Sequence, residues 1–149
     1  MDDPTTLLRA KGLRSTPHRR AVLAALRERS HATVVEVAED VARLGAAAGP
    51  AAVSELSRQG LYNVLEDLRR VDLVRSIEPA GSPTRFELQH GDNHHHLVCR
   101  VCGTVRDVPC ATGTAPCLTP SDQADFVIDE AEVLWWGTCG ACAATRGGA

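Results

Sequence analysis

Residues 93–107 read NHHHLVCRVCGTVRD, a run with three consecutive histidines, a Cys-x2-Cys pair and an aspartate. A second Cys-x2-Cys pair lies near the C-terminus. A two-residue gap lets one turn present both sulfurs to a single ion, and four thiolates in a tetrahedron select zinc. The sequence therefore predicts a structural Zn2+ site with the ligands Cys99, Cys102, Cys139 and Cys142. The alternative interpretation is four reduced cysteines without a metal.

The histidine run predicts a second kind of metal site. In a strand, residues two apart point to the same face, so His94 and His96 can share one ion while His95 faces elsewhere. Asp107 lies on the strand expected to pair with them and could reach the same ion. Ligands of this kind, without thiolate, suit Fe2+, Mn2+, Zn2+ or Ni2+ and do not separate them. The alternative is a solvated histidine cluster.

The two halves of the chain differ in charge and composition. Residues 1–89 hold 13 Arg and Lys against 12 Asp and Glu, whereas residues 90–149 hold 3 against 7 and all six cysteines. Only the first half can face an anionic polymer, and the second half has the composition of a metal module. No apolar run approaches a membrane span and no signal peptide opens the chain, so we expect a cytoplasmic protein with reduced thiols and no membrane partner.

The first half carries the pattern of a winged helix-turn-helix. Capping residues and apolar periodicity predict helices over residues 4–11, 16–28 and 33–44. Ser57 caps a fourth helix, whose apolar stripe is Leu61, Val64, Leu65 and Leu68. A hairpin over residues 73–78 and 84–88, joined by a turn rich in Gly and Pro, follows as the wing.

The fourth helix is the predicted recognition helix. Its outer face shows Arg58, Gln59, Tyr62 and Asn63 just after Ser57. In the major groove arginine reads guanine, and glutamine or asparagine reads adenine. Phosphate contacts that set the register are predicted for Arg14, Arg19 and Arg20. The alternative is a solvated helix face.

The second half is predicted to be a small sheet domain after a hinge at residues 89–93. We expect a hairpin over 95–98 and 104–108, a loop over 109–120, a short helix over 121–124, strands over 126–129 and 133–136, and a loose tail over 143–149. Cys110 and Cys117 lie in that loop. They could form a reversible disulfide under peroxide, they could add ligands to an altered metal site, or they could be inert thiols.

Together these motifs resemble the ferric uptake regulator family. The residues that carry the resemblance are 12–19, 30–32, 57–65, 85–87, 94–107 and 136–139. Within the family the chain looks most like the actinobacterial branch that represses a neighbouring catalase-peroxidase gene, on the evidence of residues 91–96, 107–110, 115–119 and 129–133.

The resemblance implies a homodimer joined through the C-terminal strands, bound to a palindromic, AT-rich operator in double-stranded DNA. It also implies a regulatory site made of His31, Glu87, His94, His96 and Asp107, with a divalent metal as corepressor. Glu87 stands where strongly peroxide-sensing members carry aspartate, and Gly60 stands in the recognition helix where alanine is usual.

We therefore expect an α+β protein. Its N-terminal winged helix-turn-helix domain covers residues 1–88, and its α/β dimerisation domain with the four-cysteine zinc site covers residues 94–149. The expected function is metal-dependent transcriptional repression that senses iron or peroxide. The alternatives are a zinc- or nickel-responsive repressor of metal uptake and, more remotely, a metalloenzyme. The enzyme ranks last because no general acid or base stands outside the ligand set.

Overall fold

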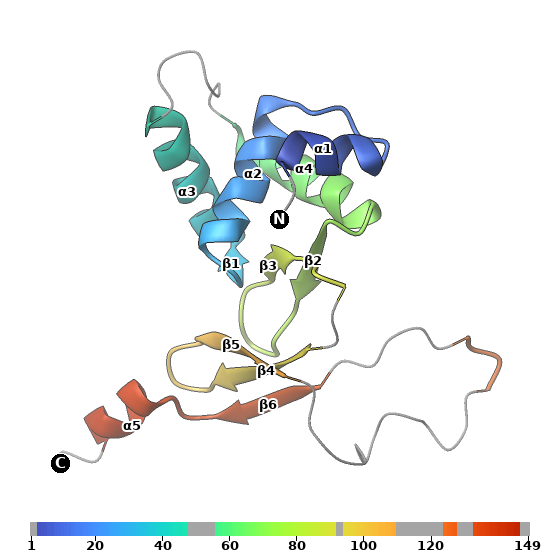
Figure 1. The fold of residues 1–149 in the computed structure, drawn as a ribbon. Coiled ribbons are helices and arrows are strands. Elements are labelled where there is room, and N and C mark those ends of the chain that lie inside the picture. Colours follow the sequence, from blue (N-terminus) through green and yellow to red (C-terminus); the bar gives the residue numbers. More distant parts are fainter. Residues whose placement is uncertain (1–2, 48–55, 92–93, 110–123, 128–132, 147–149) are drawn as a thin grey trace. The chain divides into compact units, whose positions relative to one another are not determined.

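The chain folds as two compact units, Met1–Gly91 and Asp92–Ala149 (Figure 1). The computed structural model describes residues 3–47, 56–91, 94–109, 124–127 and 133–146. Within these ranges, every helix is too short or too polar to cross a membrane. Mixed helix and sheet confirms the predicted α+β class.

The first unit contains the four expected helices: α1 (Pro4–Ala10), α2 (Pro17–Glu28), α3 (Val34–Ala47) and α4 (Arg58–Arg70). Thr16 begins α2 by accepting a hydrogen bond from the amide of Arg19 at 3.3 Å. Ser57 begins α4 in the same way, because its Oγ accepts from the amide of Gly60 at 3.1 Å. Such caps satisfy amide groups that the first helical turn leaves without partners.

Helix α3 begins with the predicted capping box. The Thr33 amide donates to Glu36 Oε2 at 2.7 Å, and the Glu36 amide donates to Thr33 Oγ1 at 3.3 Å. The helix continues to Ala47, beyond the predicted end at Leu44. The sequence after Leu44 is Gly45-Ala46-Ala47, and the two alanines favour the helix enough to carry it through the glycine.

The helices enclose an aliphatic core in the first unit. Val22, Leu26, Leu61, Leu65 and Leu68 are each no more than 2% exposed. On α4 the buried positions 61, 65 and 68 follow a helical period, which leaves the opposite side of this helix in solvent. Burial of each leucine stabilises the unit by roughly 1.5–3 kcal/mol, and this fixes the rotation of α4 about its own axis.

A three-stranded antiparallel sheet closes the first unit. The predicted wing is β2 (Val74–Ile77) and β3 (Arg85–Leu88), and the sheet order is β1-β3-β2. The first strand, β1 (Ala32–Thr33), was not predicted. Two residues are too few to show a period, and this strand exists only because Ala32 pairs with Phe86 of β3.

The second unit is a three-stranded sheet followed by a helix. Strands β4 (His94–Cys99) and β5 (Val105–Pro109) form the predicted hairpin, and β6 (Leu134–Gly137) lies on the other side of β4. Strand β6 runs parallel to β4, with Cys99 opposite Gly137. This parallel pairing brings the end of β6 to the turn that follows β4.

Two predictions for the second unit are wrong. Residues 143–146 were expected in a loose tail but belong to helix α5 (Gly140–Arg146), which an alanine-rich run favours. Phe126 and Val127 were expected in a strand but form none, and they are 78% and 96% exposed. The helix predicted over 121–124 lies mostly outside the described residues, as do Cys110 and Cys117.

Candidate metal centres and DNA-binding surface

Four thiols meet at one end of the sheet in the second unit. Cys99 ends β4 and Cys102 lies in the next turn. Cys139 lies between β6 and α5, and Cys142 lies in α5. All four Sγ atoms lie within 4.8 Å of one another, and those of Cys102 and Cys139 are 3.8 Å apart. A tetrahedral ion with Zn–S bonds of about 2.3 Å separates its sulfurs by about 3.8 Å. The cluster therefore fits a structural zinc.

Hydrogen bonds around this cluster favour the thiolate form that binds metal. The amide of Cys139, which donates to Cys99 Sγ at 3.3 Å, is the main reason that the pKa of Cys99 falls to about 6. Thr104 lowers the pKa of Cys102, with its hydroxyl 3.2 Å from that sulfur. The pKa of Cys142 instead rises to about 12. The main cause is its hydrogen bond with Cys139, and the next is its hydrogen bond with Cys102. Such crowded sulfurs can all ionise only around a cation.

A second cluster lies on the sheet of the same unit. His96 pairs with Asp107 across β4 and β5, and the Nε2 atoms of His94 and His96 each lie 3.5 Å from Asp107 Oδ1. These separations are too long for good hydrogen bonds but short enough for one ion to bind Asp107 together with either imidazole. His95 points to the other face, where its ring centroid lies 5.3 Å from that of Trp135. The predicted alternation along the strand is therefore present.

The first unit also holds an imidazole–carboxylate pair. Glu87 on β3 is 1% exposed, and its Oε2 lies 2.8 Å from Nε2 of His31. Ser30 donates its hydroxyl to the same oxygen at 3.3 Å, and Arg75 donates its Nε to Oε1. His31 has a left-handed backbone with φ of 56°, which costs a residue other than glycine about 1 kcal/mol or more. Backbone strain of this kind collects at functional sites.

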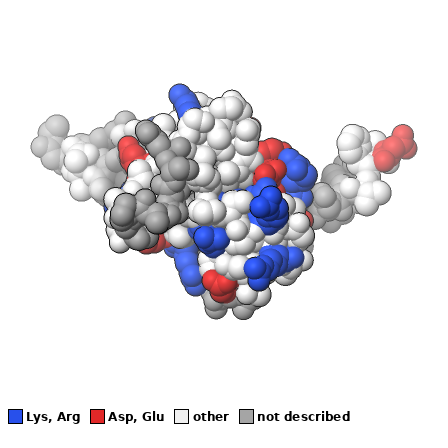
Figure 2. Space-filling view, turned by 90° about the horizontal axis from the view of Figure 1, so that it is seen from above, with Lys and Arg blue, Asp and Glu red and all other residues white. Residues whose placement is uncertain are grey.

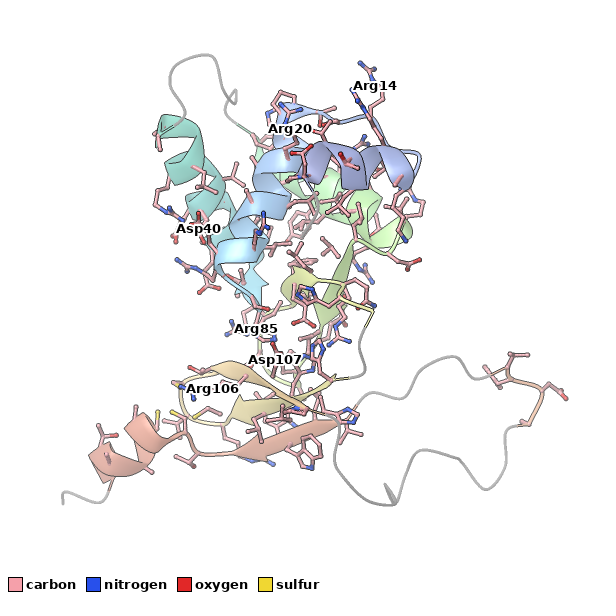
Figure 3. All side chains as sticks on the ribbon, viewed as in Figure 1. Arg14, Arg20, Asp40, Arg85, Arg106 and Asp107 are labelled. Atoms are coloured by element: carbon pink, nitrogen blue, oxygen red, sulfur yellow. The ribbon has the colours of Figure 1, made fainter. Side chains whose placement is uncertain are left out.

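Two of these contacts were not predicted from the sequence. Arg75 lies directly opposite Glu87 in the β2–β3 register, and Ser30 precedes the strained His31. The wing was predicted, so its register was the signal that could have located the Arg75–Glu87 pair. Arg85, labelled in Figure 3, also supports this region because it donates to the carbonyl oxygen of His31 at 2.9 Å.

The outer face of α4 is exposed as predicted. Its polar side chains are Arg58, Gln59, Tyr62 and Asn63, which all lie in solvent. Gln59 Nε2 donates to Asn63 Oδ1 at 3.0 Å, so these two amides are already oriented by one another. Beside them a cavity of about 340 Å³ opens between α4, the first turn of α3 and the β2–β3 loop, and Tyr62 and Arg58 help to line it.

The three arginines predicted to contact phosphate differ in their surroundings. Arg14 extends away from the helices (Figure 3). Arg19 lies 2.5 Å from Asp67 and also donates to the Arg14 carbonyl at 2.9 Å, so its guanidinium joins α2 to α4. Arg20 donates to the Ser15 carbonyl oxygen at 3.1 Å. Several Lys and Arg side chains, with a few acidic ones between them, are visible on the face shown in Figure 2.

A winged helix with an exposed polar helix, followed by a thiol cluster and a histidine–aspartate cluster, defines a metal-responsive DNA-binding protein. The family model described as the ferric uptake regulator family matches residues 10–112. The transcriptional regulator FurA of Mycobacterium tuberculosis is 47% identical over 135 residues, which cover 91% of this chain and 86% of that relative. This chain therefore belongs to the ferric uptake regulator family.

Other comparisons agree. Ferric uptake regulation protein 1 of Mycolicibacterium fortuitum is 45% identical over 91% of this chain and 80% of that protein. The crystal structure of the Vibrio cholerae ferric uptake regulator has the same fold, with a TM-score of 0.66 at 22% identity over 92% of this chain and all of that one. The family assignment and metal-dependent transcriptional repression are thus confirmed, and a metalloenzyme is set aside because the relatives are regulators of transcription.

Proposed function

We propose that a divalent metal is the corepressor of this chain and that both units supply its ligands. His31 and Glu87 would come from the first unit, and His94, His96 and Asp107 from the second. The observation that carries the proposal lies within each unit. Among the described residues, each unit gathers a buried imidazole beside a carboxylate, and neither cluster holds more than three ligands. Two and three ligands together make five, a number that suits a five- or six-coordinate ion.

A shared ion would restrict motion between the units, for which we propose residues 89–93 as the hinge. An ion shifts such an equilibrium only as far as it binds the closed arrangement more tightly than the open one. Because neither unit has a full ligand set, the open arrangement binds the ion weakly. Metal binding therefore favours the arrangement that binds DNA.

The DNA-binding form is proposed to be a homodimer, joined through the sheet of the second unit and supported by zinc at the four cysteines. Each copy would place α4 in the major groove of one half of a palindromic, AT-rich operator, in the cytoplasm. Base contacts are assigned to Arg58, Gln59, Tyr62 and Asn63. The remaining contacts, to phosphate, are assigned to Ser57, Arg14, Arg19 and Arg20.

The sensed signal is proposed to be iron, peroxide or both, and the target a catalase-peroxidase gene. The 47% identity to the transcriptional regulator FurA supports this choice of branch. The nitrogen and oxygen ligands also suit Fe2+, although they suit Mn2+, Zn2+ and Ni2+ as well. A zinc- or nickel-responsive repressor of metal uptake with the same architecture is the alternative.

A metal-by-metal DNA-binding titration tests the proposal. Zinc-loaded protein is prepared without air, and its binding to its own upstream DNA is followed by fluorescence anisotropy with Fe2+, Mn2+, Zn2+ or Ni2+ added. We expect the corepressing ion to tighten binding, and His96→Ala to abolish that gain. Replacement of the exposed Asp125, which lies outside both clusters and the hinge, by alanine is the control and should change nothing. If no ion alters DNA affinity, the corepressor model is wrong.

A further inference from the structure

The two oxygens of Glu87 have different partners. Oε2 faces the imidazole of His31 and the hydroxyl of Ser30, whereas Oε1 accepts a hydrogen bond from Arg75 Nε. The Glu87 side chain is 2% exposed and that of Arg75 is 17% exposed. The contact is therefore a largely buried ion pair within the first unit.

The strand register places the two partners of this ion pair opposite one another. Arg75 on β2 and Glu87 on β3 are directly opposed in the antiparallel ladder, so the backbone itself places the two side chains together. A carboxylate this deeply buried would be costly without a nearby cation. The guanidinium thus places a positive charge beside Glu87 and holds its Oε1 in position.

The same charge affects a metal bound at Glu87. A hydrogen bond that holds Oε1 leaves Oε2 as the oxygen beside His31, and this favours coordination through one oxygen only. A guanidinium in contact with a ligand also repels a divalent cation, because like charges in a partly buried site interact strongly. Arg75 therefore orients Glu87 and opposes the ion at the same time.

We propose that Arg75 is a positioning residue that sets the metal concentration at which this repressor responds. It holds Glu87 in one orientation, and its charge weakens divalent-ion affinity so that binding requires a higher metal concentration. This inference rests on the proposed function, because it takes Glu87 to be a ligand of the regulatory metal.

The test is a Mn2+ titration of the full-length, zinc-loaded protein, with free Mn2+ measured by electron paramagnetic resonance. Mn2+ is suited because it prefers nitrogen and oxygen ligands and leaves the thiolates to zinc. Removing the guanidinium charge with Arg75→Gln should tighten Mn2+ binding about tenfold. The same variant should be less stable than the wild type in urea when metal is absent, because the buried carboxylate has lost its cation.

The predicted changes in Arg75→Gln are opposite, because Mn2+ affinity rises while stability falls. This distinguishes a positioning role from a structural one, since loss of a residue needed only for folding would lower both stability and affinity. Arg75→Lys keeps the charge and should bind Mn2+ like the wild type. Arg75→Met, with an unbranched stem and no charge, replaces the glutamine variant if that variant fails to fold. Arg69→Gln is the control, because Arg69 forms an exposed i,i+3 pair with Glu66.

Glu87→Gln separates failure of this inference from failure of the proposed function. If Glu87→Gln weakens Mn2+ binding but the uncharged Arg75 variants bind it no more tightly than the wild type, the role of Arg75 is wrong and the ligand set stands. If Glu87→Gln leaves Mn2+ affinity unchanged, Glu87 is not a ligand, and both the inference and that part of the proposed function fail.

Discussion

Asp107→Ala is the substitution that should separate metal response from folding most cleanly. Asp107 Oδ1 lies 3.5 Å from Nε2 of both His94 and His96, yet its side chain is 48% exposed. It also lies on β5, an edge strand of the three-stranded sheet. A half-exposed residue on an edge contributes little to stability, so we expect the free energy of unfolding to change by no more than about 0.5 kcal/mol.

The effect on metal binding should be much larger. A unit negative charge about 3 Å from a divalent ion is worth roughly 2.8 kcal/mol even with the dielectric constant of water, which is the suitable limit for a half-exposed group. That energy corresponds to about a hundredfold loss of affinity. At a free metal concentration about ten times the dissociation constant of the wild type, about one-tenth of the variant would then hold metal.

Three measurements check this prediction on the same preparation. Mn2+ affinity comes from electron paramagnetic resonance, DNA affinity with and without Mn2+ from fluorescence anisotropy, and zinc content from elemental analysis. Asp125→Ala, at an exposed aspartate of the same unit, is the matched control. The reasoning is refuted if Asp107→Ala binds Mn2+ like the wild type, or if it loses zinc and unfolds together with its metal response.

Three further predictions concern architecture and stability. Cys102→Ser should lose zinc and shift the protein from dimer to monomer, as measured by metal analysis and sedimentation; retention of both would contradict the structural role of the cluster. Leu65→Ala, at a residue 1% exposed, should lower the free energy of unfolding by about 2–5 kcal/mol in urea. Burial raises the pKa of Glu36, but hydrogen bonds from Thr33 outweigh it and hold that pKa below its usual range. The stability from Glu36 is therefore present above its unfolded pKa and lost as the pH falls through the lowered value. Glu36→Gln should thus reduce the loss of stability seen as the pH falls below the ordinary carboxyl pKa of 4.5.

Local sequence determined the helices and the grouping of ligands within single elements. Thr16, Thr33 and Ser57 begin helices because a side-chain oxygen satisfies free amides next to it in the chain, a short-range effect. His94 and His96 share a face because a strand repeats every two residues. The Cys-x2-Cys spacing likewise predicts that each pair of thiols can share an ion, whatever the rest of the chain does.

Tertiary structure decided which distant groups meet. Cys139 reaches Cys99 because β6 pairs in parallel with β4. The sequence predicted that the two thiol pairs share an ion, but not the strand pairing that brings them together. Arg75 faces Glu87 through the register of the wing. Arg19 is held against Asp67 of α4, whereas the sequence predicted for it only a contact to phosphate. Periodicity and capping act over a few residues, whereas strand partners and buried ion pairs depend on how whole elements pack. The role of Arg75 therefore follows from the tertiary structure and not from the local sequence.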